Sequence, residues 1–203
     1  YHLFDQNSLR RFRETSRINN LKSLENYKTL LDADDIRRAI ARLSHEIIES
    51  NQGTKNLILI GIKTRGLHIA SRIVNMINTF ENTSLDCHSI NPQFFRDDIQ
   101  IKDKVPNIEL GVNIHEQNII LIDDVLYTGR TIRATLEAIF TLGRPKTIKL
   151  AALVDRGHRE IPIRPDFIGK SIPTSNSEHV RVFMKEEDGA DKVGLFKERK
   201  TNI

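Results

Sequence analysis

One segment of this 203-residue chain constrains its fold more than any other. Residues 119–122 are four consecutive aliphatic side chains, and the adjacent carboxylates Asp123 and Asp124 follow them directly. An apolar run rich in β-branched residues is typical of a strand buried on both faces, as in a parallel sheet. Ligands of such sheets bind just beyond the carboxyl ends of the strands. We therefore expect the two acids to lie where a ligand would bind.

The turn after the two acids has the parts of a phosphate site. A helical pattern begins at Thr131, so the unpaired N–H groups of its first turn and its dipole would attract an anion. Gly129 would let the backbone approach a ligand closely, and Thr128 adds a hydroxyl group. An ordinary helix cap is the alternative interpretation. The turn is not a P-loop, because it lacks the Gly-x-x-x-x-Gly-Lys pattern.

The two carboxylates suggest chemistry on a sugar. Adjacent strand residues point to opposite faces, so Asp123 and Asp124 are not expected to share a proton. Beside a phosphate site they suit two sugar hydroxyls or a Mg²⁺-bound water, or they would stabilise positive charge on a sugar ring. The alternative is that one acid caps the turn while the other pairs with an arginine.

A second loop bounded by glycines follows another buried strand. Residues 61–66 read Gly-Ile-Lys-Thr-Arg-Gly, and Lys63 and Arg65 supply cationic donors that can grip a phosphate. An exposed turn with two solvated cations is the alternative. The loop would share the sheet's carboxyl edge with the acids. Two phosphate-binding loops at one edge predict a ligand that carries phosphate at both ends.

Helical and strand patterns alternate along the chain, which predicts an α/β fold with a mainly parallel sheet. One helix is expected from about Asp32 to before Gly53, because Ile36, Ile40, Leu43 and Ile47 are spaced to form one helical face. Two more helices are expected over 67–80 and 131–142. The expected strands are 57–60, 119–123 and 147–154, and 86–95, 180–184 and 193–196 are further candidates. Pro92 suits an edge strand or a bulge. Residues 155–178 are interpreted as loops, and 97–118 as a long, functional loop.

Composition adds bounds on function. The net charge is +4, and about half of it comes from the polar segment 1–27, so any nucleic-acid surface must be a local patch. We interpret 1–27 as a poorly ordered extension and 28–203 as one domain. The single cysteine, Cys87, excludes an intramolecular disulfide and favours a reducing cytoplasm. No apolar run is long enough for a membrane span, and no secretory leader opens the chain.

Several motifs together resemble one family. Residues 119–131 are similar to the phosphoribosyl-diphosphate signature of type I phosphoribosyltransferases, and their Asp-Asp-Val-Leu-Tyr-Thr-Gly-Arg-Thr form most resembles the PyrR family of bifunctional pyrimidine operon regulators and uracil phosphoribosyltransferases. Matching segments are 61–66, 96–98, 153–163, 168–170 and 172–175. The resemblance covers about residues 28–198. It implies a type I phosphoribosyltransferase fold, with a parallel sheet, flanking helices, a small hood and a flexible active-site loop.

The resemblance implies a reaction and its residues. Uracil and 5-phosphoribosyl diphosphate would give UMP and diphosphate, with Mg²⁺ bound mainly through the diphosphate donor and not directly by the protein. Asp123, Asp124 and Arg96 would be catalytic, Arg96 beginning the flexible loop. The implied donor contacts are Lys63, Thr64, Arg65, Gly66, Asp123, Asp124, Val125, Leu126, Tyr127, Thr128, Gly129, Arg130 and Thr131, and the implied base contacts are Val154, Asp155 and Arg156.

The resemblance also implies a regulatory partner. UMP-bound protein would grip a hairpin in the leader RNA of a pyrimidine operon and favour termination. The candidate RNA contacts are Arg38, Arg42, His45, His158, Arg159 and Arg164. A solvated helix face is at least as good an interpretation for the first three, and His158 and Arg159 could equally organise the loop after the strand. The family also implies a homo-oligomer, a dimer or larger. A purine phosphoribosyltransferase and a non-catalytic regulator that binds UMP and RNA are the alternative functions.

Overall fold

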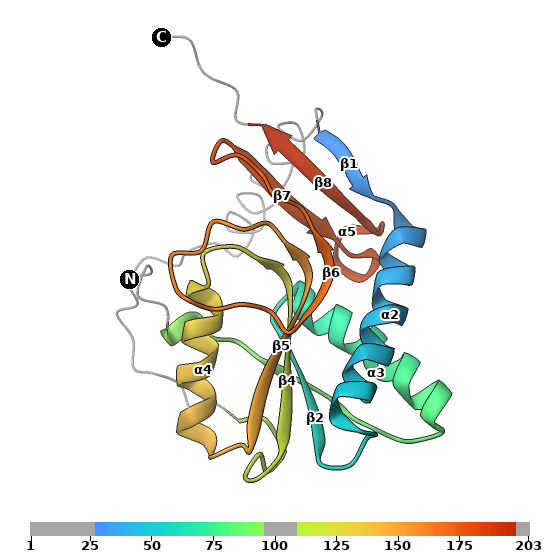
Figure 1. The fold of residues 1–203 in the computed structure, drawn as a ribbon, viewed down its shortest axis with the longest axis vertical. Coiled ribbons are helices and arrows are strands. Elements are labelled where there is room, and N and C mark those ends of the chain that lie inside the picture. Colours follow the sequence, from blue (N-terminus) through green and yellow to red (C-terminus); the bar gives the residue numbers. More distant parts are fainter. Residues whose placement is uncertain (1–26, 96–108, 198–203) are drawn as a thin grey trace, which may run out of the picture.

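The computed structural model describes residues 27–95 and 109–197, which form two sheets and the helices packed against them (Figure 1). Along the chain the elements are β1 (Tyr27–Leu31), α2 (Ala33–Asn51), β2 (Leu57–Ile62), α3 (Arg65–Glu81), β3 (Cys87–Ile90), η1 (Gln93–Phe95), β4 (Asn118–Leu126), α4 (Arg130–Leu142), β5 (Thr147–Asp155), β6 (Phe167–Ser171), β7 (Glu178–Phe183), α5 (Lys185–Asp188) and β8 (Lys192–Lys197).

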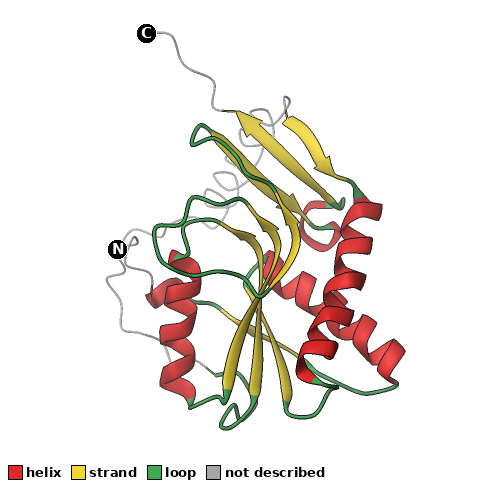
Figure 2. Cartoon of the chain, in the orientation of Figure 1, coloured by secondary structure: helices red, strands yellow, loops and turns green. Residues whose placement is uncertain are grey.

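The main sheet has five strands in the order β3-β2-β4-β5-β6, and every neighbouring pair is parallel. Helices α2 and α3 cover one face and α4 covers the other, as Figure 2 shows. The apolar core is accordingly divided into two clusters, one on each side of the sheet. The predicted fold class is confirmed.

A smaller antiparallel sheet, β1-β8-β7, stands beyond the carboxyl edge of the main sheet (Figure 1). We call this sheet, together with α5, the hood. Buried Val182, Met184 and Val193 join it to the core cluster that α2 and α3 share with the main sheet. The hood is thereby packed onto the same side of the molecule as α3.

The helix predicted from Asp32 is confirmed, and its first turn shows why it begins there. The Asp32 carboxylate accepts the backbone N–H of Asp35, and the Asp35 carboxylate accepts the N–H of Asp32. This reciprocal cap satisfies two otherwise unpaired donors. Ile36, Leu43 and Ile47 then lie fully buried on the face that meets the core.

Three predictions about strands were wrong. Residues 155–178 are not all loop, because β6 adds a parallel edge strand beside β5. Gly169 interrupts the apolar pattern by which this strand could have been predicted. A glycine is required there because a Cβ would lie 2.5 Å from the Leu153 carbonyl oxygen. Strand β4 also continues to Leu126, beyond the expected end at Asp123. The strand predicted over 86–95 is shorter than expected: β3 lies at the sheet's edge but ends at Ile90, before Pro92, and residues 93–95 form η1.

Candidate functional site

The acidic pair lies inside β4 at the point where one neighbouring strand ends. Pairing with β2 stops at Ile122, whereas pairing with β5 continues to Leu126. The Asp123 carboxylate accepts the N–H of Asp124 at 3.0 Å, and the Asp124 carboxylate accepts the N–H of Val125 at 2.9 Å. Both carboxylates are thus held by local backbone donors.

The surroundings of Asp124 disfavour its charge. Burial raises the pKa of the Asp124 carboxyl, while the hydrogen bond from Val125 and the positive charge of Arg65 act in the opposite direction. The net pKa lies above the ordinary carboxyl value. A carboxylate destabilised by burial gains when positive charge develops beside it, which suits a cationic transition state.

The predicted phosphate turn connects β4 to α4. Gly129 adopts a left-handed conformation with φ of 93° and occupies the N-cap position of α4 without a side-chain hydrogen bond to the first turn. The Thr128 carbonyl accepts the N–H groups of Glu160 and Ile161, so the loop after β5 supports the turn. The N-terminus of α4 therefore lies a few residues beyond the carboxyl end of β4, where an anion site is expected.

The second predicted loop packs directly against the acids. Residues Lys63 and Thr64 form a cis peptide bond between β2 and α3, and both side chains are exposed. A Cβ on Gly66 would lie 2.5 Å from the Ile122 carbonyl oxygen and 3.3 Å from the Asp123 Cα. The absence of a side chain on Gly66 is what lets the start of α3 approach the end of β4 that carries the acids.

The Arg65 side chain points away from this loop toward the hood. Its Nε and Nη2 atoms donate to both oxygens of Asp188, at 3.0 and 2.8 Å. Of the two cations predicted for the loop, Lys63 remains exposed, while Arg65 is engaged in an ion pair. The third predicted catalytic residue, Arg96, lies outside the described residues.

The predicted base contacts form the wall at the end of β5. Val154 is fully buried, and the Asp155 carboxylate accepts the N–H of Gly157 and a bond from Arg159. The buried guanidinium of Arg156 lies 3.8 Å above the centre of the Tyr127 ring. It also donates to Thr174 Oγ1 and to the Glu178 carbonyl. These side chains organise the wall and tie it to the phosphate turn and the hood.

The candidate RNA contacts on α2 differ in how far they are engaged. Arg42 donates to Glu46 and to the carbonyls of Ile168 and Gly169, so it fastens α2 to β6. Arg38 forms an exposed ion pair with Asp35, and the exposed His45 ring stacks on Phe80.

The candidates after β5 also differ. Arg159 donates to the carbonyls of Leu126, Tyr127, Gly157 and Ile163 and to the Asp155 carboxylate, which makes it the organiser of its loop. His158 is exposed and hydrogen-bonds the Thr174 carbonyl, and Arg164 is exposed. Arg38, His45, His158 and Arg164 therefore offer more surface to a partner than Arg42 or Arg159.

Comparison with known proteins places this geometry in a family. Residues 26–187 match the phosphoribosyl transferase domain. Over 170 residues the chain is 54% identical to the bifunctional protein PyrR of Leuconostoc mesenteroides, covering 83% of this chain and 97% of that protein. It is 51% identical to the bifunctional protein PyrR of Clostridioides difficile over 169 residues, or 82% and 96% of the two chains.

The chain belongs to the PyrR family of phosphoribosyltransferases. The predicted family and its pentosyltransferase class are thereby confirmed. Among solved structures, a hypoxanthine phosphoribosyltransferase from Staphylococcus aureus superimposes with a TM-score of 0.64 at 22% identity, over 84% of this chain and 92% of that one. The enzyme from Trypanosoma cruzi gives 0.65 at 17% identity, over 85% and 97%. These two likenesses concern the fold alone.

Two contacts of this PyrR-family site were absent from the sequence-based predictions. One is the Arg65–Asp188 ion pair, and the other is the stack of Arg156 on Tyr127. Their partners are separated by 123 and 29 residues along the chain, so no local pattern signals them. In the part of the chain that the structure describes, no helix is long and apolar enough to cross a membrane.

Proposed function

We propose that the protein transfers a phosphoribosyl group from 5-phosphoribosyl diphosphate to uracil, giving UMP and diphosphate, and that it regulates pyrimidine genes by binding their leader RNA when UMP is bound. The observation that carries the catalytic proposal is the meeting of three features at one sheet edge. They are the acidic pair in β4, the N-terminus of α4, and the Lys63–Thr64 loop that Gly66 brings against Asp123.

Each feature suits one part of the donor. The N–H groups at the start of α4 would hold the 5′-phosphate. Asp123 and Asp124 would bind the ribose hydroxyls and stabilise the oxocarbenium-like charge that develops as the diphosphate departs. Lys63 and the loop backbone would hold that leaving diphosphate. Uracil would then approach from the side of the β5 wall, where Val154, Asp155 and Arg156 lie.

The site also suits Mg²⁺ that arrives with the donor. The described residues contain no group of three or more His, Cys, Asp or Glu side chains arranged to hold a metal ion. Asp123 and Asp124 nevertheless offer hard carboxylate oxygens, the ligand type that Mg²⁺ prefers. We propose that the diphosphate and water supply most ligands, with these acids nearby. When bound, Mg²⁺ would neutralise charge on the leaving diphosphate.

The catalytic proposal is tested by diphosphate release from 5-phosphoribosyl diphosphate with uracil as acceptor. Wild-type protein should turn over, and the double variant Asp123→Asn/Asp124→Asn should not. The same assay with hypoxanthine and guanine tests the purine alternative, which the structural likeness to hypoxanthine phosphoribosyltransferases makes worth measuring. Faster turnover with a purine than with uracil would reject uracil as the acceptor.

The regulatory proposal rests on exposed basic side chains at the β5–β6 end of the molecule and on α2. Arg164→Ala is the sharper test, because Arg159→Ala would also remove the five acceptor contacts that hold its loop. With UMP present, Arg164→Ala should weaken leader RNA binding and reduce the slope of log K against log salt by about 0.7–0.9. Unchanged affinity and slope would remove Arg164 from the RNA surface.

The remaining parts of the proposal follow from this function. A cytoplasmic location would bring the protein to nascent message, and a single cysteine fits that compartment. A homo-oligomer of two or more copies is also proposed, and size-exclusion chromatography with light scattering tests it. If uracil, hypoxanthine and guanine all fail as acceptors while UMP-dependent RNA binding persists, the protein is the non-catalytic regulator instead.

A further inference from the structure

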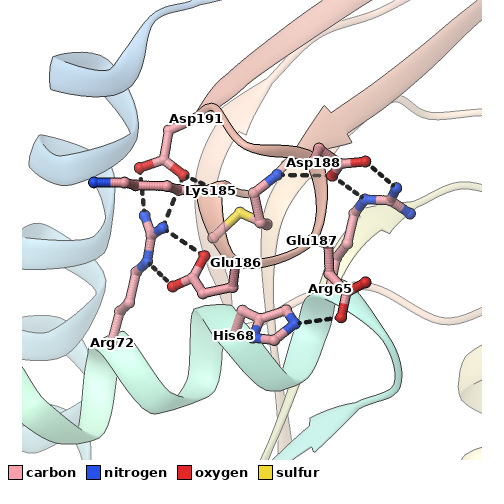
Figure 3. A network of polar contacts seen from close by, with 9 residues as sticks. Arg65, His68, Arg72, Lys185, Glu186, Glu187, Asp188 and Asp191 are labelled. Atoms are coloured by element: carbon pink, nitrogen blue, oxygen red, sulfur yellow. Dashed lines mark hydrogen bonds and ion pairs between the residues drawn. The ribbon is translucent and has the colours of Figure 1, made fainter. Parts of the chain in front are cut away.

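A row of polar contacts, which we call the ladder, joins the hood to α3. Arg65, His68 and Arg72 lie three and four residues apart, so they share one face of α3. Opposite them is the acidic turn that contains α5 (Figure 3). The contacts are Arg65 with Asp188 at 2.8 Å, His68 with Glu187 at 3.0 Å, Arg72 with Glu186 at 2.8 Å and Arg72 with Asp191 at 2.8 Å.

The Arg65–Asp188 pair differs from the others in its position. Arg65 is the first residue of α3 and follows Thr64 directly, so its backbone belongs to the loop proposed for the diphosphate. Arg72 lies two helical turns further on. A change in the ion pair of Arg65 would therefore shift the diphosphate loop. A change in the ion pairs of Arg72 would act on the middle of α3 instead.

The geometry of the pair is restrictive. Nε and Nη2 of Arg65 donate to separate oxygens of Asp188, a two-point contact that fixes direction as well as distance. Asp188 Oδ2 accepts the backbone N–H of Met184 as well, at 3.0 Å. The two side chains retain only 25% and 13% of their exposure. Asp188 is thus held by its own turn while it holds Arg65.

The charges around the pair favour its ionised form. Burial raises the pKa of Asp188, but the hydrogen bonds from Arg65 and Met184 and the charge of Arg181 outweigh it, so the pKa lies below its ordinary value. The Asp188 hydrogen bond is the largest influence on Arg65, whose pKa is raised; Asp124 and Glu187 are the further acids that raise it. Arg65 is therefore paired with a hood carboxylate and also feels the charge of the site carboxylate Asp124.

We propose that Asp188 is a positioning residue for phosphoribosyl transfer. By holding the Arg65 guanidinium against the hood, it fixes the start of α3 and presents Lys63 and the loop backbone to the donor's diphosphate. This inference rests on the proposed function, since it concerns how that donor is held. Arg65 then acts through the loop's placement, and Lys63 is the loop cation that meets the donor.

The test compares Asp188→Asn with Asp191→Asn. The first change weakens the ion pair with Arg65, and the second weakens the comparable ion pair with Arg72 in the same ladder. One charge-assisted hydrogen bond corresponds to a tenfold change or more. We expect Asp188→Asn to raise the KM for 5-phosphoribosyl diphosphate about tenfold while the KM for uracil stays within twofold. Asp191→Asn should leave both KM values within twofold of wild type.

A second variant keeps the test decisive if Asp188→Asn does not fold. Arg65→Lys retains the charge but cannot make the two-point contact, so it should raise the same KM. An equal donor KM for wild type, Arg65→Lys and the two Asn variants, at comparable Tm, would overturn the inference. Calorimetric titration with 5-phosphoribosyl diphosphate gives the same comparison without turnover. A wild-type protein that binds donor but never uses uracil would thus reject the proposed function without rejecting the role of Asp188.

Discussion

A methyl group added at Gly66 should slow catalysis strongly while the fold survives. In Gly66→Ala the new Cβ would lie 2.5 Å from the Ile122 carbonyl oxygen. The shortest usual carbon–oxygen distance is about 3.3 Å, so α3 and β4 must separate by roughly 0.8 Å. Neither side can rotate away, because both are backbone, and Ile122 is fully buried.

The magnitude follows from that displacement. Overpacking of this kind costs about 1–3 kcal/mol of unfolding free energy, or roughly 2–4 °C in Tm for each kcal/mol in a chain of this size. The separation is forced beside the Asp123 Cα, and a shift of about 1 Å in a catalytic group can cost about a hundredfold in rate. We expect kcat/KM for uracil to fall several tens of fold.

The assay is initial-rate UMP formation, paired with a thermal melt. Gly53→Ala is the matched control. Gly53 follows the end of α2 with φ of 108°, and no atom lies within 4 Å of the position that a Cβ would take there. That change should lower Tm through backbone strain of about 1–2 kcal/mol and leave kcat/KM within twofold. If Gly66→Ala retained activity to the same degree, the close approach of α3 to the acids would not matter for catalysis.

Three further predictions concern burial. Arg156→Lys removes the stack on Tyr127 and the contact with the Glu178 carbonyl, so unfolding free energy measured in urea should fall by about 2–4 kcal/mol; a loss below about 0.5 kcal/mol would contradict this. Because burial raises the pKa of Asp124, its ionisation destabilises the folded state as pH rises from the ordinary value of 3.8 through the raised one. Asp124→Asn should therefore have a higher Tm than wild type at pH 7 but not below pH 3.8, and a lower Tm at pH 7 would refute the sign. Burial raises the pKa of the Cys87 thiol to about 11, so iodoacetamide at about pH 8 should label the folded protein at least tenfold more slowly than the unfolded one.

Local patterns account for most of the fold. The spacing of Ile36, Ile40, Leu43 and Ile47 predicts α2, and the aliphatic runs predict β2 and β4. The full extent of β4 could not be predicted, because its last residues are strand only by pairing with β5. Strand β6 was missed for a different reason, since Gly169 and the exposed Lys170 and Ser171 leave it without an apolar pattern.

The site, like the fold, has parts that local sequence patterns predict and parts that they do not. Residue types at the ends of buried strands predict the acidic pair, the Gly129 turn and the Lys63 loop, and the structure brings all three to one edge. The partners of individual charges could not be predicted. From sequence alone, an arginine in a loop is interpreted as a phosphate ligand. The structure shows that Arg65 instead forms an ion pair with Asp188 of α5. For Arg159 the sequence allows both an RNA contact and a role in organising its loop, and only the backbone carbonyls around its guanidinium show that it does the second.

The most direct test of the account is acceptor choice. Purified protein, 5-phosphoribosyl diphosphate and Mg²⁺ would be incubated with uracil, hypoxanthine or guanine, and nucleotide and diphosphate would be measured together. We predict equal amounts of UMP and diphosphate with uracil, little product with either purine, and no product from Asp123→Asn/Asp124→Asn. Purine nucleotide as the main product, or diphosphate without UMP, would contradict the central claim.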